Sequence, residues 1–333
     1  MVKLATNYLG LNLKNPLIAG SSGLTDTVSG ILDLEKQGAG AVVLKSLFEE
    51  EILLEMEGSL QKMASNGDIY PETLEFYEHE DTEKESTLQY LDLIREAKAK
   101  VQIPVIASIN CMTASQWTYF PKQIEAAGAD ALELNVFVLP SDFDKTPEEN
   151  ESVYFDILKE IKKQVTIPVA LKVSYYFSSL ASSLKKFSEA GADGLVLFNR
   201  FYSPDFDLDK MEVTSSHVLS SPADLPISLR WISIMSGRVN CDLAASTGVH
   251  DGEALIKQIL AGANAVQVVS TLYRNGPGQI DVMLKKLTSW MEEKGYSTLE
   301  EFRGKMAQKA SSNPAAFERV QFMKYFRGYH PAG

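Results

Sequence analysis

The stretch Ala127-Gly128-Ala129-Asp130-Ala131-Leu132-Glu133-Leu134-Asn135 holds the junction that predicts the fold of this 333-residue chain. A helix-like segment ends at a Gly, and a short run of apolar residues follows. The same junction recurs at Gly38, Gly191 and Gly262. Gly suits the end of a helix because it readily adopts left-handed backbone angles. A run that is apolar throughout is typical of a parallel strand that is covered on both faces.

Four further apolar runs bring the predicted strands to eight. Those at 105–108 and 169–173 each follow a Pro, which fits at the first residue of a strand; the other two lie at 17–19 and 242–245. Predicted helices separate the strands at 26–37, 85–100, 115–127, 149–164, 179–190, 229–238, 252–261 and 278–294. This alternation predicts an α/β fold, a (β/α)8 TIM barrel. A doubly wound sheet is the less favoured alternative, because no GxGxxG follows the first strand.

Three segments lie outside the repeat. Residues 4–14 predict a short hairpin that caps the bottom of the barrel. Residues 47–84 form a long acidic excursion that is either an active-site lid or a solvated loop. An Asn-Pro pair opens a predicted helix over 313–327, which packs on the barrel or on a second subunit. We therefore expect one domain over residues 1–305 and a C-terminal helical extension over 306–333.

Charge and cysteine content exclude several function classes. The formal net charge of −12 argues against binding to nucleic acid or to an anionic membrane. Cys111 and Cys241 are far apart and form no CxxC, so we expect no iron–sulfur cluster and no metal site. Two isolated cysteines and the absence of an apolar signal segment or an 18-residue apolar run predict a cytoplasmic protein.

The active site of a TIM barrel lies at the C-terminal ends of its strands. The polar residues that end the predicted strands are Ser21, Ser22, Gly23, Lys45, Ser46, Asn110, Cys111, Asn135, Lys172, Ser174, Asn199, Arg200, Ser246, Thr247, Gly248, Ser270 and Thr271. Lys45 and Lys172 end apolar strands, and a buried ammonium needs an anion or a polarised ligand. The alternative for either lysine is a salt bridge across the barrel mouth with Glu133.

Small polar loops follow the last two strands. Ser246-Thr247-Gly248 and Ser270-Thr271 offer backbone donors and hydroxyls, and barrels often bind phosphate at this pair of loops. Ordinary turn chemistry is the alternative. A phosphate site, two lysines and several amides suit a phosphorylated cofactor with a planar polar ring, such as FMN. Arg200 is a candidate to pair with a substrate carboxylate, or else forms a surface salt bridge.

These residues occur in motifs that resemble, in the same order, those of class 1 dihydroorotate dehydrogenases. The matching segments are Asn15–Gly23, Leu44-Lys45-Ser46, Leu132–Asn135, Leu171-Lys172-Val173, Gly248, Ser270-Thr271 and Arg274–Pro277. The resemblance runs from about residue 4 to 305. Leu197–Asp205 and Leu229-Arg230-Trp231 look more like the subgroup called dihydroorotate dehydrogenase-like proteins.

The resemblance implies an FMN-dependent oxidoreductase that converts dihydroorotate to orotate in pyrimidine biosynthesis by hydride transfer to flavin N5. It also implies a homodimer and a possible electron-transfer partner. The implied FMN contacts are Gly20, Ser21, Ser22, Lys45, Ser46, Asn135, Lys172, Thr247, Gly248, Ser270 and Thr271. The implied substrate contacts are Asn135, Asn199 and Arg200. Lys45 is also expected to tune the flavin during catalysis.

One position departs from the family pattern. Val138 stands where the class 1 enzymes carry a catalytic Cys, and valine cannot accept a proton. Ser141, Asp142 or Cys111 are candidates to replace it as the base. Alternatively, the enzyme acts on a different small substrate, or the protein binds flavin without dihydroorotate activity. A barrel enzyme that binds a sugar phosphate and no flavin is a further alternative.

Overall fold

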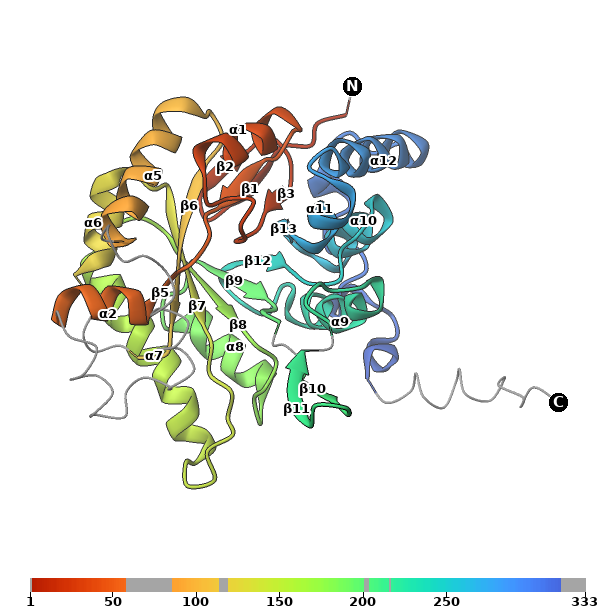
Figure 1. The fold of residues 1–333 in the computed structure, drawn as a ribbon. Coiled ribbons are helices and arrows are strands. Elements are labelled where there is room, and N and C mark those ends of the chain that lie inside the picture. Colours follow the sequence, from red (N-terminus) through yellow and green to blue (C-terminus); the bar gives the residue numbers. More distant parts are fainter. Residues whose placement is uncertain (1, 58–85, 114–118, 201–203, 216, 319–333) are drawn as a thin grey trace.

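A closed barrel of eight parallel strands forms the centre of the computed structural model, which describes residues 2–57, 86–113, 119–200, 204–215 and 217–318 (Figure 1). The barrel strands are β3 (Leu17–Ala19), β4 (Ala41–Val43), β6 (Val105–Cys111), β7 (Ala131–Val136), β8 (Val169–Val173), β9 (Gly194–Leu197), β12 (Asp242–Ala245) and β13 (Ala265–Val268). Strand β3 pairs with both β4 and β13, and β4 pairs with β6, which closes the ring. The predicted (β/α)8 TIM barrel is confirmed.

Eight helices surround the strands. They are α1 (Val28–Lys36), α5 (Ser86–Lys100), α6 (Phe120–Ala127), α7 (Pro147–Gln164), α8 (Leu180–Glu189), α9 (Leu225–Met235), α10 (Gly252–Ala261) and α12 (Gln279–Lys294). Their ends follow local sequence rules: Gly128 and Gly262 end α6 and α10 with φ of 101° and 118°. Thr146 and Glu149 form a capping box at the start of α7. None of the described helices is long and apolar enough to cross a bilayer.

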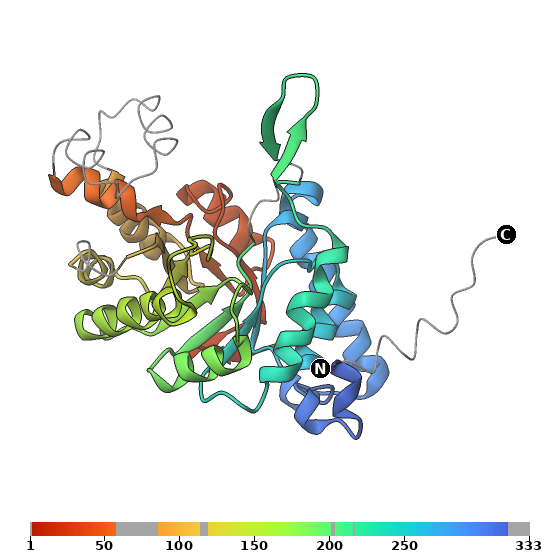
Figure 2. The ribbon, with the colours of Figure 1, turned by 90° about the horizontal axis from the view of Figure 1, so that it is seen from below.

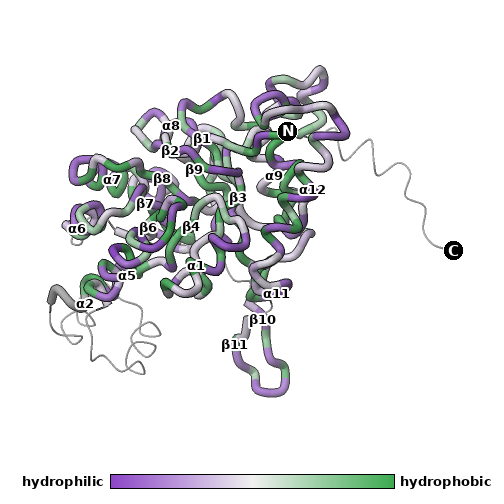
Figure 3. The backbone as a smooth tube through the Cα atoms, turned by 90° about the horizontal axis from the view of Figure 1, so that it is seen from above, coloured by the Kyte–Doolittle hydropathy of each residue, from purple (hydrophilic) through white to green (hydrophobic). Residues whose placement is uncertain are grey.

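The hydrophobic residues form two layers, one on each side of the barrel wall. The outer layer lies between strands and helices, and the inner layer fills the lower barrel with small residues such as Ala41, Ala131 and Ala170. Hydrophobic positions recur along the central strands in Figure 3, whereas many of the connecting loops are hydrophilic. Because inner and outer side chains alternate along each strand, the strand register decides which residues reach the mouth.

A hairpin closes the bottom of the barrel, as the sequence predicted for residues 4–14. Its strands are β1 (Thr6–Tyr8) and β2 (Leu11–Leu13), and they pair antiparallel. Tyr8, Leu9 and Leu13 are buried against the inner layer. A Cβ on Gly194 would lie 2.5 Å from Leu9 Cδ2, so β9 needs Gly at this position.

Several elements were not predicted. They are β5 (Leu47–Phe48), α2 (Glu49–Glu57), α11 (Ser270–Asn275) and a hairpin of β10 (Pro204–Asp207) and β11 (Glu212–Ser215). This second hairpin projects away from the barrel (Figure 2). Residues 58–85 lie outside the described residues, so the lid interpretation of the acidic excursion stays a prediction.

The C-terminal extension is described only in part. The predicted helix over 313–327 begins as a 3-10 helix, Pro314–Phe317, and residues 319–333 lie outside the described residues. Before it, Met306 N donates to Leu260 O over 2.8 Å, so this part of the chain lies against the end of α10. The domain boundary at residue 305 stays a prediction.

Candidate active site

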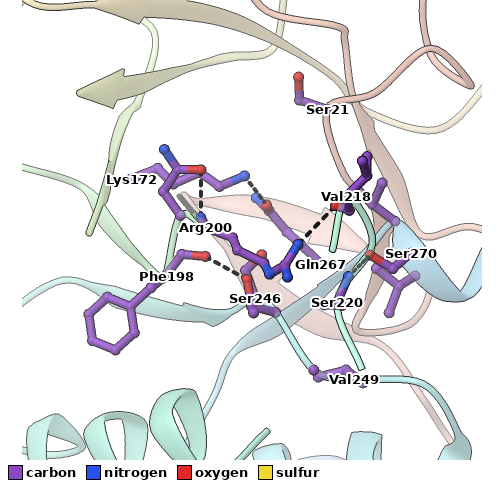
Figure 4. Close-up of a pocket in the computed structure, with 15 residues that line it drawn as sticks. Ser21, Lys172, Phe198, Arg200, Val218, Ser220, Ser246, Val249, Gln267 and Ser270 are labelled. Carbon is purple, nitrogen blue, oxygen red and sulfur yellow. Dashed lines mark hydrogen bonds between the residues drawn. The ribbon is translucent and has the colours of Figure 1, made fainter. Parts of the chain in front are cut away.

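A cavity of about 220 Å³ opens at the C-terminal ends of the barrel strands (Figure 4). Its lining comes from β8 and β13 and from the segments that follow β3, β9, β11, β12 and β13. The lining residues are Ser21, Lys172, Phe198, Asn199, Arg200, Val218, Ser220, Ser246, Thr247, Gly248, Val249, Gln267, Val268, Val269 and Ser270. Seven of the predicted site residues are thereby brought together: Ser21, Lys172, Asn199, Arg200, Thr247, Gly248 and Ser270.

Lys172 reaches the floor of this cavity from β8. Its Nζ donates to Glu133 Oε1 over 3.2 Å and to Gln267 Oε1 over 3.1 Å. The salt bridge with Glu133 that the sequence offered as an alternative is therefore present at Lys172. Lys45, in contrast, is exposed, and the expectation of two buried lysines is wrong for it. Only one of the two ammonium groups is therefore placed in a weakly solvated environment.

The loop after β12 has the tight backbone that suits a phosphate site. Thr247 and Gly248 have φ of 73° and 81°. A Cβ on Gly248 would lie 2.2 Å from Leu225 N, so the loop approaches the start of α9 closely enough to require Gly. Thr247 Oγ1 donates to Phe198 O over 3.0 Å, which fixes the loop against the end of β9.

The two hydroxyl groups at the start of α11, directly after β13, have different roles. Ser270 lines the cavity, and its Oγ accepts from Ser220 N over 2.9 Å. Thr271 is fully buried, and its Oγ1 donates to His250 O over 2.8 Å. The Thr271 side chain therefore supports the loop and does not line the cavity. His250 Nε2 lies 3.1 Å from Ser220 Oγ, so His250 connects Thr271 to the segment that carries Ser220.

A chain of serines forms the opposite wall. Ser21 Oγ accepts from Ser46 N over 2.9 Å, and Ser46 Oγ lies 2.8 Å from Ser108 Oγ. Tyr90 holds Ser108 in turn, because its hydroxyl accepts from Ser108 N over 2.7 Å. Ser46 thus positions Ser21 without lining the cavity itself. Gly20 is close-packed beside them: a Cβ there would lie 2.8 Å from Val269 Cγ2.

Two side-chain amides, at the end of β7 and just after β9, have buried polar atoms with no partner among the described residues; of the two, Asn199 lines the cavity. Asn135 Oδ1 and Asn199 Nδ2 are both buried and unpaired. Asn199 Oδ1 accepts from Arg200 N over 2.9 Å, and Arg200 Nη1 donates to Val218 O over 2.8 Å. Because buried polar groups are normally hydrogen-bonded, these two atoms indicate a polar ligand. The residues present therefore fit a cofactor with ring amides and a phosphate.

A smaller recess of about 80 Å³ adjoins the cavity and shares Phe198, Asn199 and Arg200 with it. Tyr175 and Tyr176, whose ring centroids are 4.8 Å apart, form an aromatic wall of this recess. Neither tyrosine was predicted, because both lie beyond Lys172 and Ser174, the polar residues that end this strand in the sequence. The recess supplies space beside the amides for a second, smaller molecule.

The profile of the family described as dihydroorotate dehydrogenase matches residues 3–291. The chain belongs to the dihydroorotate dehydrogenase family. It is similar to the catalytic subunit of dihydroorotate dehydrogenase B (NAD(+)) from Thermoplasma volcanium, with 27% identity over 317 residues that cover 91% of this chain and 98% of the relative. The subunits of that name from Thermoplasma acidophilum and Methanocaldococcus jannaschii are each 26% identical and cover 91% and 90% of this chain and 99% and 97% of their own lengths. The family consists of oxidoreductases that act on CH–CH donors.

The resemblance places Val138 at the position of the family's catalytic Cys. Val138 follows β7 and is half-buried against the outer hydrophobic layer. Cys111 ends β6, but it is fully buried in that same outer layer, whereas the inner face of β6 carries Ser108 and Asn110. Burial, together with the charges of Glu49 and Glu50, raises the pKa of the Cys111 thiol well above its usual value. This placement argues against Cys111 as the base.

The other two candidate bases lie in the loop after β7. Ser141 and Asp142 are exposed, and neither lines the cavity. Asp142 Oδ1 accepts from Asp144 N over 3.0 Å, and its carboxylate lies 3.7 Å from Lys145 Nζ. Neither residue touches the cavity in this arrangement of the loop, so a role for either requires the loop to approach the mouth.

Sequence reasoning missed two polar residues that the cavity uses. Gln267 lies inside the apolar run of β13, whereas the predicted site residues follow the ends of such runs. The inward face was predictable, because Ala265 and Gln267 are two residues apart. Ser220 lies on a segment between β11 and α9 that carries no family-like motif, so no sequence signal marked it.

Proposed function

We propose that this chain is an FMN-dependent oxidoreductase that acts on dihydroorotate. The observation that carries the proposal is one cavity lined by a buried lysine, by an amide whose buried nitrogen has no partner, and by the two polar loops after β12 and β13. A phosphate, a planar polar ring and a small cyclic substrate need these three kinds of contact together.

The residues divide into those that hold FMN and those that hold the substrate. Thr247, Gly248 and Ser270 would hold the phosphate, and Lys172 and Asn135 would bind the ring. Ser21, Gly20 and Ser22 shape the wall, with Ser46 behind them and Thr271 supporting the phosphate loop. When bound, FMN accepts two electrons from the substrate, and a cationic Lys172 stabilises the negative charge that develops. Asn199 and Arg200 orient the substrate, and Arg200 pairs with its carboxylate. Lys45 lies at the exposed rim and contributes positive charge there.

The proton that leaves C5 of dihydroorotate needs an acceptor in place of the family's Cys. We propose that the loop after β7, with Ser141 and Asp142, supplies it when the substrate is bound. A carboxylate near the carbon acid is the better acceptor at neutral pH, because a serine hydroxyl needs its own base. Val138 favours a second candidate function, an FMN oxidoreductase that takes a different small substrate.

Anaerobic addition of dihydroorotate to the FMN-loaded protein tests the proposal. Loss of the oxidised flavin absorbance is expected. A loaded protein that keeps its flavin spectrum after prolonged incubation contradicts dihydroorotate as the substrate. Bleaching by another cyclic amide, with none by dihydroorotate, would instead support the second candidate function.

We also propose an electron-transfer partner that docks beside the cavity. Support comes from the relatives, which are named as the catalytic subunits of NAD(+)-linked enzymes. The β10–β11 hairpin adds a second reason, because Phe206 and Val213 are register partners and are 67% and 73% exposed. Val218, just beyond this hairpin, lines the cavity. If the purified, substrate-reduced protein reduces NAD(+) without another protein, this proposal is wrong.

A homodimer and a cytoplasmic location complete the proposal. The two cysteines are free, as expected in a reducing compartment. The homodimer rests on the family resemblance, and light scattering of the purified protein measures it directly.

A further inference from the structure

Three polar side chains close a ring of hydrogen bonds beneath the cavity. Lys172 Nζ donates to Glu133 Oε1 and to Gln267 Oε1, the latter bond being visible in Figure 4. Gln267 Nε2 donates to Glu133 Oε2 and completes the ring. The three residues come from β7, β8 and β13, and Glu133, Lys172 and Gln267 are 1%, 8% and 2% exposed. Solvent therefore does not substitute for any of the three bonds.

The ring has only one arrangement of donors and acceptors. An ammonium group only donates, a carboxylate only accepts, and an amide does one of each through its two ends. Because Glu133 only accepts, the amide nitrogen of Gln267 must face it. The amide oxygen of Gln267 must then face Lys172. Two of the three ammonium hydrogens are used in this way, and one remains for the cavity that Lys172 lines.

We propose that Glu133 and Gln267 are positioning residues that fix the direction of the Lys172 side chain and leave a single N–H for the cofactor. This proposal rests on the proposed function, since the group that receives this N–H is FMN. Glu133 supplies the charge that balances the buried ammonium, and Gln267 fixes its direction. Among the described ion pairs, this one has both side chains at 10% exposure or less. A buried charge that loses its partner destabilises the fold strongly.

The ring allows a test by exchange of its members. In Glu133→Gln, two amides and one ammonium must make three contacts, and one contact always joins two donors. In Gln267→Glu, two carboxylates face each other. In the double variant Glu133→Gln/Gln267→Glu, the carboxylate and the amide have exchanged places, and all three contacts are matched again. A role in which Glu133 or Gln267 only fills space does not predict this recovery.

The experiment measures two quantities for the wild type, both single variants and the double variant. One is the Tm of the protein freed of FMN, and the other is the Kd for FMN from the quenching of its fluorescence. We expect each single variant to lower the Tm and to raise the Kd by at least about tenfold, as for a lost hydrogen bond to a charged group. The double variant should recover most of the wild-type Tm and most of the wild-type affinity for FMN.

Asn15→Ala is the matched control, because Asn15 is 4% exposed and bonds Leu17 N and Gly38 O at the other end of β3. It should lower the Tm and leave the Kd unchanged.

The outcomes distinguish failure of the hydrogen-bonded ring from failure of the proposed function on which the positioning role depends. A double variant that is no more stable than the single variants overturns the ring itself. Recovery of the Tm in the double variant, with an FMN Kd that never changed, shows a structural ring and overturns the positioning role. A wild type that binds no FMN overturns the proposed function and the positioning role, while the four Tm values still decide whether the ring exists.

Discussion

Asn135 and Lys172 are register partners on the neighbouring strands β7 and β8, and both stand at the C-terminal end of the barrel. Lys172 has its charge balanced by Glu133 over 3.2 Å, whereas Asn135 Oδ1 is buried without a partner among the described residues. Lys172 therefore has two of its three N–H groups bonded within the protein, whereas the Asn135 oxygen has no bond within it. This contrast decides which substitutions should affect stability and which should affect binding.

Asn135→Leu should stabilise the FMN-free protein and weaken FMN binding. The substitution removes a desolvated acceptor, whose burial costs about 1–3 kcal/mol, and keeps a side chain of similar size. Thermal unfolding of the FMN-free protein and the Kd for FMN measure the two effects. If the Tm of the FMN-free variant falls, the Asn135 oxygen is already paired in the ligand-free protein, and this interpretation of the site is wrong.

Gly248→Ala should abolish tight FMN binding. Its φ is 81°, and the added Cβ would lie 2.2 Å from Leu225 N, so the loop must move away from α9. The free energy of unfolding should fall by about 1–3 kcal/mol from overpacking, in addition to the cost of the backbone angle.

Gly191→Ala is the control for that substitution. Its φ of 103° is also left-handed, but no atom lies within 4 Å of an added Cβ. Gly191→Ala should lower the free energy of unfolding by about 1–2 kcal/mol and leave the Kd for FMN unchanged. Equal loss of binding in both variants would show that the loop after β12 does not hold the cofactor.

Val138→Cys should accelerate reduction of the bound flavin by dihydroorotate. The substitution puts a thiol where the resemblance places the family's catalytic Cys, and this thiol reaches the cavity when the loop after β7 approaches the mouth. A positioned base then contributes about 10²–10⁴-fold to a rate. Anaerobic stopped-flow absorbance measures the change. Cys111→Ala should leave the rate within about twofold of the wild type, because Cys111 faces the outer layer. A larger decrease in the Cys111 variant would restore that residue as the base.

Stability should decrease in acid through His250. Burial, together with the nearby charge of Arg274, lowers the pKa of this imidazole in the folded protein. The neutral ring is therefore favoured by folding, and its contribution is complete above the unfolded pKa of about 6.5. It is lost as the pH falls below that value toward the lowered pKa. The Tm of the wild type should fall more between about pH 7.5 and pH 5 than that of His250→Gln. Parallel pH profiles would contradict this assignment.

The barrel was predictable because its signals are local. Gly128 and Gly262 ended helices where left-handed angles were needed, and each apolar run matched a strand. The β10–β11 hairpin was not predictable in this way, because its alternating residues 204–215 cover no core and its strands are exposed. Its pattern was indistinguishable from that of an irregular loop.

The sequence predicted which strand ends form the site. It did not predict which side chains at those ends point into the barrel and which point to the outer hydrophobic layer. Cys111 and Asn110 are adjacent in sequence, yet only the register within β6 places Cys111 in the outer layer. Lys45 was expected to be buried because it follows four apolar residues, but it is exposed at the rim. Gln267 was missed because its importance depends on Glu133 and Lys172, which are 134 and 95 residues away.

The proposed function requires that the cavity at the barrel mouth binds FMN. The most direct test is the visible absorption spectrum of the purified protein after incubation with FMN and removal of the excess, with quantification of the flavin released on unfolding. We expect an oxidised flavin spectrum and about one FMN per chain, because one cavity among the described residues is lined by Lys172 and by the polar segments after β12 and β13. A colourless protein that releases no flavin would contradict it.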